Sequence, residues 1–210
     1  MPRINPHRRR DLTDAAIELL ASSGVHGLTH RAVEKAAELP PGTASNYFRS
    51  REALLMATAQ RITELHFADM DRAARQYRKA TADAGQRAGD HLPELATQVS
   101  DLLAESLWGA VTTYRVRYLA ILELQLEARR RPALAAAVAA LLENSVRFTA
   151  GHHAQLGLPI PTDKIPILIT LYQGALFALI TAPPEHITQA TVHSVAHAIV
   201  HGALPNWNCA

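Results

Sequence analysis

The sequence predicts an all-α protein of about nine helices, and three observations support this fold class. Apolar residues recur at helical spacing, as Leu12, Ala16, Leu19 and Leu20 do at positions i, i+4, i+7 and i+8. Proline, glycine or polar residues bound each such segment, and no alternation typical of strands persists. With 210 residues, 48% of them hydrophobic, the chain can bury one substantial core and a small satellite domain.

Three short helices are predicted in the first 50 residues. The first spans residues 11–22 and ends at Gly24. Thr29 is a good N-cap for the second helix, which is about two turns long. A turn over residues 37–40 leads to a third helix at residues 41–47, where Pro41 suits the first position because its missing N–H would be unpaired there.

Longer helices are predicted in the rest of the chain. Ser50 caps a long helix that runs toward residue 80, and residues 81–89, rich in alanine, glycine and aspartate, form a linker. Five further helical segments follow at residues 92–107, 114–129, 132–156, 163–181 and 185–203. We therefore expect an N-terminal domain at residues 1–50 and a larger helical domain at residues 51–210.

Positive charge is concentrated near the N-terminus. Residues 1–61 hold nine Lys and Arg against six Asp and Glu, whereas the remainder holds twelve against thirteen. A phosphate-facing surface needs such an excess, although a solvated face can carry it by chance. The lone cysteine, Cys209, excludes an intramolecular disulfide and a cysteine metal cluster. Because acidic residues interrupt the basic N-terminus, no secretion signal is predicted, and we expect a cytoplasmic protein.

One apolar stretch has to be weighed against a membrane span. Residues 165–184 carry no charge and are long enough to cross a bilayer as a helix. Pro166, Gln173 and Gly174 interrupt the stretch, and a buried or partner-covered helix has the same composition. Together with the apolar stripe of the last helix, it favours a dimer interface and no membrane. The members of that stripe are Val192, Val195, Ala196, Ile199 and Ala203.

The third predicted helix is short and polar, which suggests contact with nucleic acid. Thr43, Ser45 and Asn46 are compact hydrogen-bonding side chains, and asparagine can bind the N6/N7 edge of adenine with two bonds. Arg49 and Arg51 are residue types that contact phosphate. Each residue alone is more often merely solvated, so the interpretation depends on the whole set.

These residues carry a resemblance to a known family. The run from Gly42 to Phe48, followed by the run from Ser50 to Leu55, resembles the helix-turn-helix domain of TetR-family transcriptional regulators. The resemblance covers about the first quarter of the chain. It implies that Thr29 caps a helix and approaches phosphate, that Arg31 can read guanine, and that Arg51 stands where the family has a phosphate-binding lysine. The expected DNA contacts are Thr29, His30, Arg31, Thr43, Ser45, Asn46, Tyr47, Arg49 and Arg51.

The chain departs from the family pattern in its turn and in its third helix. Glu38 occupies a position where the family usually has glycine in a left-handed backbone, which costs a side chain about 1 kcal/mol or more. Pro40 replaces the usual serine cap. Ser45 and Asn46 replace a pair that is often aromatic, which makes base reading by Asn46 more plausible.

The resemblance also implies that the larger domain binds a small molecule between its helices and dimerises through the last two. Candidate ligand contacts are Trp108, Tyr114, Tyr118, Glu123, Phe148 and Tyr172. For each aromatic residue, core packing is the more frequent role. Glu123 and Glu127 are more simply explained by salt bridges with Arg115, Arg117 or Arg130.

The histidines of the last helix leave a second class of function open. His193, His197 and His201 lie at i, i+4 and i+8, and the first pair has the spacing of two zinc ligands. No carboxylate stands at the general-base position, so surface or interface histidines are favoured over a metal site or an enzyme. The prediction is a dimeric regulator without cofactor or metal, most simply a repressor released from a palindromic operator by a small molecule. The alternatives are a helical metal-binding enzyme and an interaction protein without DNA binding.

Overall fold

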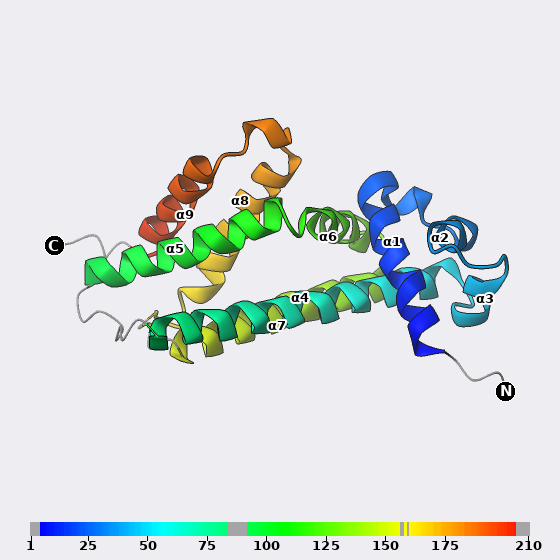
Figure 1. The fold of residues 1–210 in the computed structure, drawn as a ribbon, viewed down its shortest axis with the longest axis horizontal. Coiled ribbons are helices and arrows are strands. Elements are labelled where there is room, and N and C mark those ends of the chain that lie inside the picture. The colour runs from blue at the N-terminus through cyan, green and yellow to red at the C-terminus, as the bar shows by residue number, and fades with distance from the viewer. Residues whose placement is uncertain (1–4, 84–91, 156–157, 159, 205–210) are drawn as a thin grey trace. The chain divides into compact units, whose positions relative to one another are not determined.

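A computed structural model describes residues 5–83, 92–155, 158 and 160–204, and over these residues the fold is entirely helical (Figure 1). Nine α-helices and one 3-10 turn lie in the described part of the chain. This confirms the predicted fold class. In chain order the α-helices are α1 (Pro6–Gly27), α2 (His30–Ala36), α3 (Thr43–Tyr47), α4 (Arg51–Asp83), α5 (Leu92–Val111), α6 (Arg115–Ala128), α7 (Pro132–Gln155), α8 (Ile165–Thr181) and α9 (Gln189–Ala203); the 3-10 turn η1 (Pro184–His186) precedes α9.

The chain divides into two compact units. Unit 1 comprises Met1–Asp69 and Val116–Leu142, and unit 2 comprises Met70–Arg115 and Glu143–Ala210. Helices α4 and α7 therefore contribute to both units. The functional boundary predicted at residue 50 stays a prediction.

Helix α1 is longer than the sequence pattern indicated. Its N-cap is Asn5, whose side chain accepts a hydrogen bond from the His7 N–H at 2.9 Å, and Pro6 takes the first position. This cap lies before the first apolar residue of the stripe, which explains why periodicity placed the start at residue 11. The predicted break at Gly24 is present, with φ 63° and ψ −175°, and one further turn follows it.

Helix α3 begins two residues later than predicted. Gly42 is its N-cap and has a left-handed backbone with φ 84°, so Pro41 lies in the turn and not at the first helical position. The helix is then only five residues long. Ala44 and Phe48 are the side chains of this segment that enter the core.

The core of unit 1 holds α1, α2, α3, the start of α4, and α6 together. Its largest fully buried side chains include Leu12, Leu20, Leu28, Val33, Leu54 and Ile62. Burial of each such aliphatic side chain stabilises the fold by about 1.5 to 3 kcal/mol. We call α1, α2 and α3 the head.

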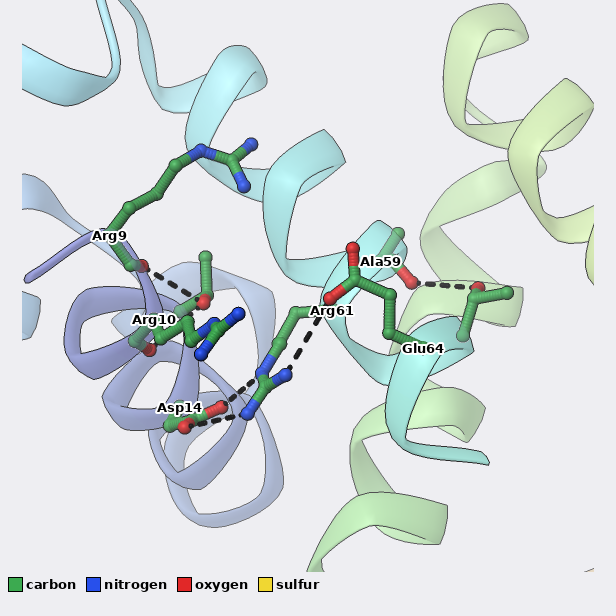
Figure 2. Close-up of polar contacts among 8 residues, drawn as sticks. Arg9, Arg10, Asp14, Ala59, Arg61 and Glu64 are labelled. Atoms are coloured by element: carbon green, nitrogen blue, oxygen red, sulfur yellow. Dashed lines mark hydrogen bonds and ion pairs between the residues drawn. The ribbon is translucent and has the colours of Figure 1, made fainter. Parts of the chain in front are cut away.

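An ion pair joins α1 to α4 at the edge of this core (Figure 2). Arg61 donates from Nε to Asp14 Oδ1 at 2.7 Å and from Nη2 to Asp14 Oδ2 at 3.2 Å. Glu64 lies 3.6 Å from the same guanidinium. The hydrogen bond with Asp14 raises the pKa of Arg61 above its usual value. A two-point contact of this kind fixes orientation as well as distance, so it sets how α1 lies on α4.

Within unit 2, α5, α8 and α9 pack against one another pairwise. Val99 and Leu107 of α5, Leu168 of α8, and Val192 and Val200 of α9 are among its buried side chains. Four members of the predicted α9 stripe are buried, and Val195 is half-buried. The last helix starts at Gln189 and not at residue 185, because Thr188 provides the cap by accepting from the Thr191 N–H. Of the predicted linker, residues 81–83 belong to α4 and the others lie outside the described residues.

Among the described residues, α7 is the one helix that is long and apolar enough to cross a membrane by length and composition. Helix α8, the segment weighed in the sequence, has 17 residues and belongs to the shorter apolar helices. One such helix is weak evidence of a membrane span.

The left-handed backbone predicted at Glu38 is present. Its φ is 54°, and Glu38 is the one non-glycine residue with positive φ in the described part of the chain. Gly42, four residues later, has φ 84°, and a Cβ built on it would meet no atom within 4 Å. Both positions have a left-handed backbone, which suits the glycine at position 42 and strains the glutamate at position 38.

We predict that Glu38→Gly stabilises the protein by about 0.5 to 1 kcal/mol, because removal of the left-handed strain outweighs the added freedom of the unfolded chain. The matched change, Gly42→Ala, introduces the same strain without a steric clash and should destabilise by a similar amount. Urea unfolding followed by circular dichroism measures both. A lower unfolding midpoint for Glu38→Gly would show that the side chain, and not the backbone, dominates at this position.

Candidate nucleic-acid interface

Contacts from outside α3 hold this helix in place. The Ala44 N–H donates to Glu34 Oε1 of α2 at 2.7 Å. His30 Nε2, also of α2, donates to the Phe48 carbonyl at 2.8 Å. Thr29 caps α2 as predicted, since its hydroxyl accepts from the Ala32 N–H at 3.1 Å. Both ends of α3 are thus fixed to α2, and α2 is fixed at its own start.

Four of the predicted DNA-contact residues are exposed side chains that the protein itself leaves free. They are Arg31 at the start of α2, Ser45 and Asn46 on α3, and Arg49 just after α3. Within the described residues, none of them makes a side-chain hydrogen bond or an ion pair. Two amide- or hydroxyl-bearing side chains between two guanidinium groups match the needs of base edges flanked by phosphates.

Other predicted contact residues have internal partners. The Thr43 hydroxyl donates to the Pro40 carbonyl at 2.6 Å. Tyr47 Oη accepts from the Asn5 N–H at 3.3 Å, which links α3 to the cap of α1. His30 uses its Nε2 in the hydrogen bond to the Phe48 carbonyl. These three residues shape the interface, and their direct contact with DNA stays a prediction.

Arg51 has a structural role that the sequence pattern did not indicate. Its Nε donates to the Leu28 carbonyl at 2.8 Å, and its Nη2 donates to the Val25 carbonyl. Carbonyls at the end of a helix lack intrahelical partners, and a cation there is favourable. Arg51 therefore ties the end of α1 to the start of α4. Its predicted phosphate contact is not tested by these bonds.

Glu34 is the residue supporting α3 that sequence reasoning missed. Its relative exposure is 6%, and its partner lies ten residues further along the chain. The one signal in the sequence for such a contact was the turn before α3, which holds two prolines and a glycine and therefore no side chain that could cap α3. That signal indicates that a cap is needed but not which residue supplies it.

Four of the six candidate ligand contacts lie in unit 2, and all four are half-buried. Tyr172 Oη of α8 lies 3.1 Å from Ser106 Oγ of α5. Tyr114 packs against Gly109, and the Phe148 ring is stacked on His152 at 6.1 Å between centroids. Trp108 is on α5. These contacts place aromatic side chains on several helices of unit 2.

The other two candidates lie in unit 1. Tyr118 of α6 is edge-on to His66 of α4, with centroids 6.0 Å apart. Burial, followed by the charge of Arg117, lowers the pKa of His66 to about 4, so this ring is neutral at physiological pH. The Glu123 carboxylate lies over Gly24, where a Cβ would come within 3.1 Å of Oε2. Both side chains are packed against α1 or α4.

The salt bridges expected around α6 are present in part. Glu127 pairs with Arg130 at 3.5 Å, as predicted, and also with Arg131 at 2.5 Å. Arg117 instead pairs with Asp69 of α4 at 2.6 Å, and both side chains are largely buried. Such a buried pair needs both partners, because a lone buried charge is strongly destabilising.

A small apolar cavity lies between α4, α6 and α7 within unit 1. Its lining shares no residue with the six candidates, and apolar side chains at helical spacing give no sequence signal that separates such a cavity from core. The lining residues are Ala59, Ile62, Thr63, Ile121, Leu124, Gln125, Ala137, Val138 and Leu141.

The histidine row of α9 is exposed or half-buried. His193 Nε2 lies 2.9 Å from Asp101 Oδ1 of α5, and the rings of His197 and His201 are 3.9 Å apart. The described residues hold no group of three or more His, Cys, Asp or Glu side chains arranged to bind a metal ion.

Comparison with known proteins agrees with this geometry. A family model described as the tetracyclin repressor-like C-terminal domain matches residues 94–206, which is more than half of the chain. A second model, described as bacterial regulatory proteins of the tetR family, matches residues 12–58 and so contains α2 and α3. Among curated protein sequences, none matches this chain.

Solved structures share the fold at low identity. A TetR-family member from Streptomyces coelicolor is 24% identical with a TM-score of 0.62, and the match covers 92% of this chain and 98% of that one. A transcriptional regulator from Rhodococcus is 15% identical with a TM-score of 0.71, covering 94% and 96%. The multidrug binding protein EbrR, complexed with malachite green, is 24% identical with a TM-score of 0.59, covering 92% and 98%. With a matching model at each end, the chain belongs to the TetR family of transcriptional regulators, which are DNA-binding and ligand-binding proteins and not enzymes.

Proposed function

We propose that this regulator is a dimeric repressor that binds a palindromic operator and is released from it by a small amphipathic molecule. The observation that carries the proposal is that α3 is held by bonds to its backbone, which leaves its exposed side chains without partners in the protein. Glu34 and His30 hold the helix through its backbone, while Ser45 and Asn46 are exposed and free to bond elsewhere.

Asn46 is the side chain that we assign to base reading. Its amide offers a donor and an acceptor side by side, which matches the N6 and N7 atoms of adenine in the major groove. Ser45 can bond to several bases and is less selective. Arg31 and Arg49 flank this pair, so Arg31 can reach guanine or phosphate and Arg49 can reach phosphate.

A second copy of the chain is the partner that we assign to α8. Ile167, Leu171 and Phe177 of this helix are 44%, 40% and 53% exposed, and they lie on one face. Gly174 on the same face is open, since a Cβ there would meet no atom within 4 Å. An apolar face with room for close approach suits a two-fold interface, and two heads are needed for two half-sites about 34 to 36 Å apart or a multiple of this.

The ligand is assigned to unit 2, where Trp108, Tyr114, Phe148 and Tyr172 supply aromatic surface and the tryptophan and tyrosines add polar tips. The structural neighbour EbrR is described with malachite green and with proflavin. An aromatic, amphipathic ligand is the corresponding proposal for this chain. Tyr118 and Glu123, which pack within unit 1, are weaker candidates.

Repression follows from occupancy of the operator, and release follows from a shift between two conformations. A ligand that binds better to the conformation with mismatched heads favours that conformation by its difference in affinity, and by no more than this. The proposed site of action is the cytoplasm, where the operator is accessible.

Selection of binding sites from a random duplex library with the purified protein tests the proposal. An enriched inverted repeat supports a dimeric reader. Malachite green and proflavin, added to the bound complex, then test release. A selected pool without dyad symmetry would contradict the dimeric operator model.

Replacement of Asn46 by alanine is predicted to weaken binding to the selected operator by about 1 to 3 kcal/mol, because a bidentate base contact is lost. Binding to random duplex should hardly change. Fluorescence anisotropy at several salt concentrations measures both affinities. The matched change, Arg49→Ala, should weaken both duplexes alike and reduce the slope of log K against log salt by about one. Equal losses on both duplexes for Asn46→Ala would remove its base-reading role.

Replacement of Phe177 by aspartate is predicted to weaken the dimer by about 2 kcal/mol or more, because the interface would bury an unpaired charge. Leu126→Asp on α6 is the matched control, since Leu126 is 58% exposed and lies off the proposed interface. Sedimentation velocity over a range of concentrations measures both. A Phe177→Asp variant that stays as dimeric as the control would place the interface elsewhere.

A further inference from the structure

The start of α3 lacks the usual means of satisfying its backbone. Its N-cap residue, Gly42, has no side chain to accept a hydrogen bond. The Thr43 N–H donates to the Pro40 carbonyl at 3.2 Å, but the next N–H, that of Ala44, finds no acceptor in the turn. First-turn N–H groups of a helix need such acceptors, and the cost of leaving one buried is comparable to that of a lost hydrogen bond.

Glu34 supplies this acceptor from the preceding helix. Its Oε1 lies 2.7 Å from the Ala44 nitrogen, the short distance typical of a charge-assisted bond. Ala44 is fully buried and Glu34 is 6% exposed. Buried glutamates are rare unless they have a partner, so the burial of this one indicates that the bond to α3 is its role.

We propose that Glu34 is a positioning residue for DNA reading: by capping α3 from α2, it fixes the orientation in which α3 presents Ser45 and Asn46. This rests on the proposed function of α3. Glu34 itself is enclosed by the head and does not face DNA. Its effect on recognition is therefore exerted through the Ala44 backbone.

The geometry explains why orientation, and not only stability, depends on this bond. The Ala44 N–H is adjacent in the chain to Ser45, so a shift of the capped nitrogen moves the reading side chains with it. The other end of α3 has a separate attachment, from His30 to the Phe48 carbonyl. When the first attachment is lost, α3 can pivot about the second while Phe48 stays buried.

Two substitutions at Glu34 distinguish the effect of its acceptor oxygen from the effect of its negative charge. Glu34→Gln retains a side-chain oxygen at about the same reach but carries no charge, and Glu34→Ala removes the acceptor. Glu38→Gln removes a carboxylate from the turn between α2 and α3, four residues after Glu34. Glu38 is exposed and does not cap a helix. This substitution controls for the change in electrostatic attraction to phosphate.

The experiment compares the affinity of each full-length variant for a duplex selected by the wild-type protein with its affinity for random duplex. Because a bond to a charged acceptor is worth more than one to a neutral acceptor, the ratio of the two affinities should fall roughly tenfold or more for Glu34→Ala and less for Glu34→Gln. Glu38→Gln should keep the wild-type ratio. Thermal unfolding of each variant confirms that the head is folded at the temperature of the assay.

Two outcomes would overturn the proposal. The first is an unchanged ratio in folded Glu34→Ala, which includes an equal loss of affinity on both duplexes. The second is a fall of the ratio in Glu38→Gln as large as that in Glu34→Ala. If Glu34→Ala does not fold, an unchanged ratio in folded Glu34→Gln overturns it and a reduced ratio supports it. Failure of the wild-type protein to select any operator would instead contradict the proposed function.

Discussion

The attachment of α3 to α2 is the constraint on which the proposed DNA-reading surface depends. A helix of five residues is far below the length at which helices persist alone in water, because nucleation fixes several residues for one hydrogen bond. Helix α3 therefore takes its conformation from Glu34 at one end, from His30 at the other, and from Phe48 in the core. Ser45 and Asn46, the exposed side chains of α3, therefore take no part in holding the helix in place.

The remainder of the head supports that attachment. Helix α2 can position α3 only if α2 itself is fixed, and Thr29 fixes its start. Arg51 ties the end of α1 to the start of α4, and Arg61 joins the same two helices through Asp14. Directional bonds to backbone carbonyls and to a carboxylate define geometry more narrowly than apolar packing does. The proposed binding to a symmetric pair of half-sites requires a rigid head.

Local signals in the sequence predicted most of this fold, and distant contacts account for the differences. Caps at Thr29 and Ser50 depend on residues within three positions, so they could be predicted, whereas the left-handed backbone at Glu38 was expected from the resemblance to the TetR family. The start of α3 was misplaced because the proline rule favoured Pro41, whereas Gly42 takes a left-handed backbone. Glu34 and Arg51 were missed as anchors because their partners lie 10 and 23 to 26 residues away. The exposed Ser45 and Asn46 follow from the motif, but their reading role is still a prediction.

The central claim is that α3 places Asn46 against the major-groove edge of an adenine. Substitution of 7-deazaadenine for each adenine in a selected half-site tests this most directly, because it deletes the N7 acceptor and leaves base pairing intact. We expect wild-type affinity to fall at one symmetric pair of positions, and Asn46→Ala to show no further fall there. Unchanged wild-type affinity at every adenine, or the same fall in Asn46→Ala, would contradict the account.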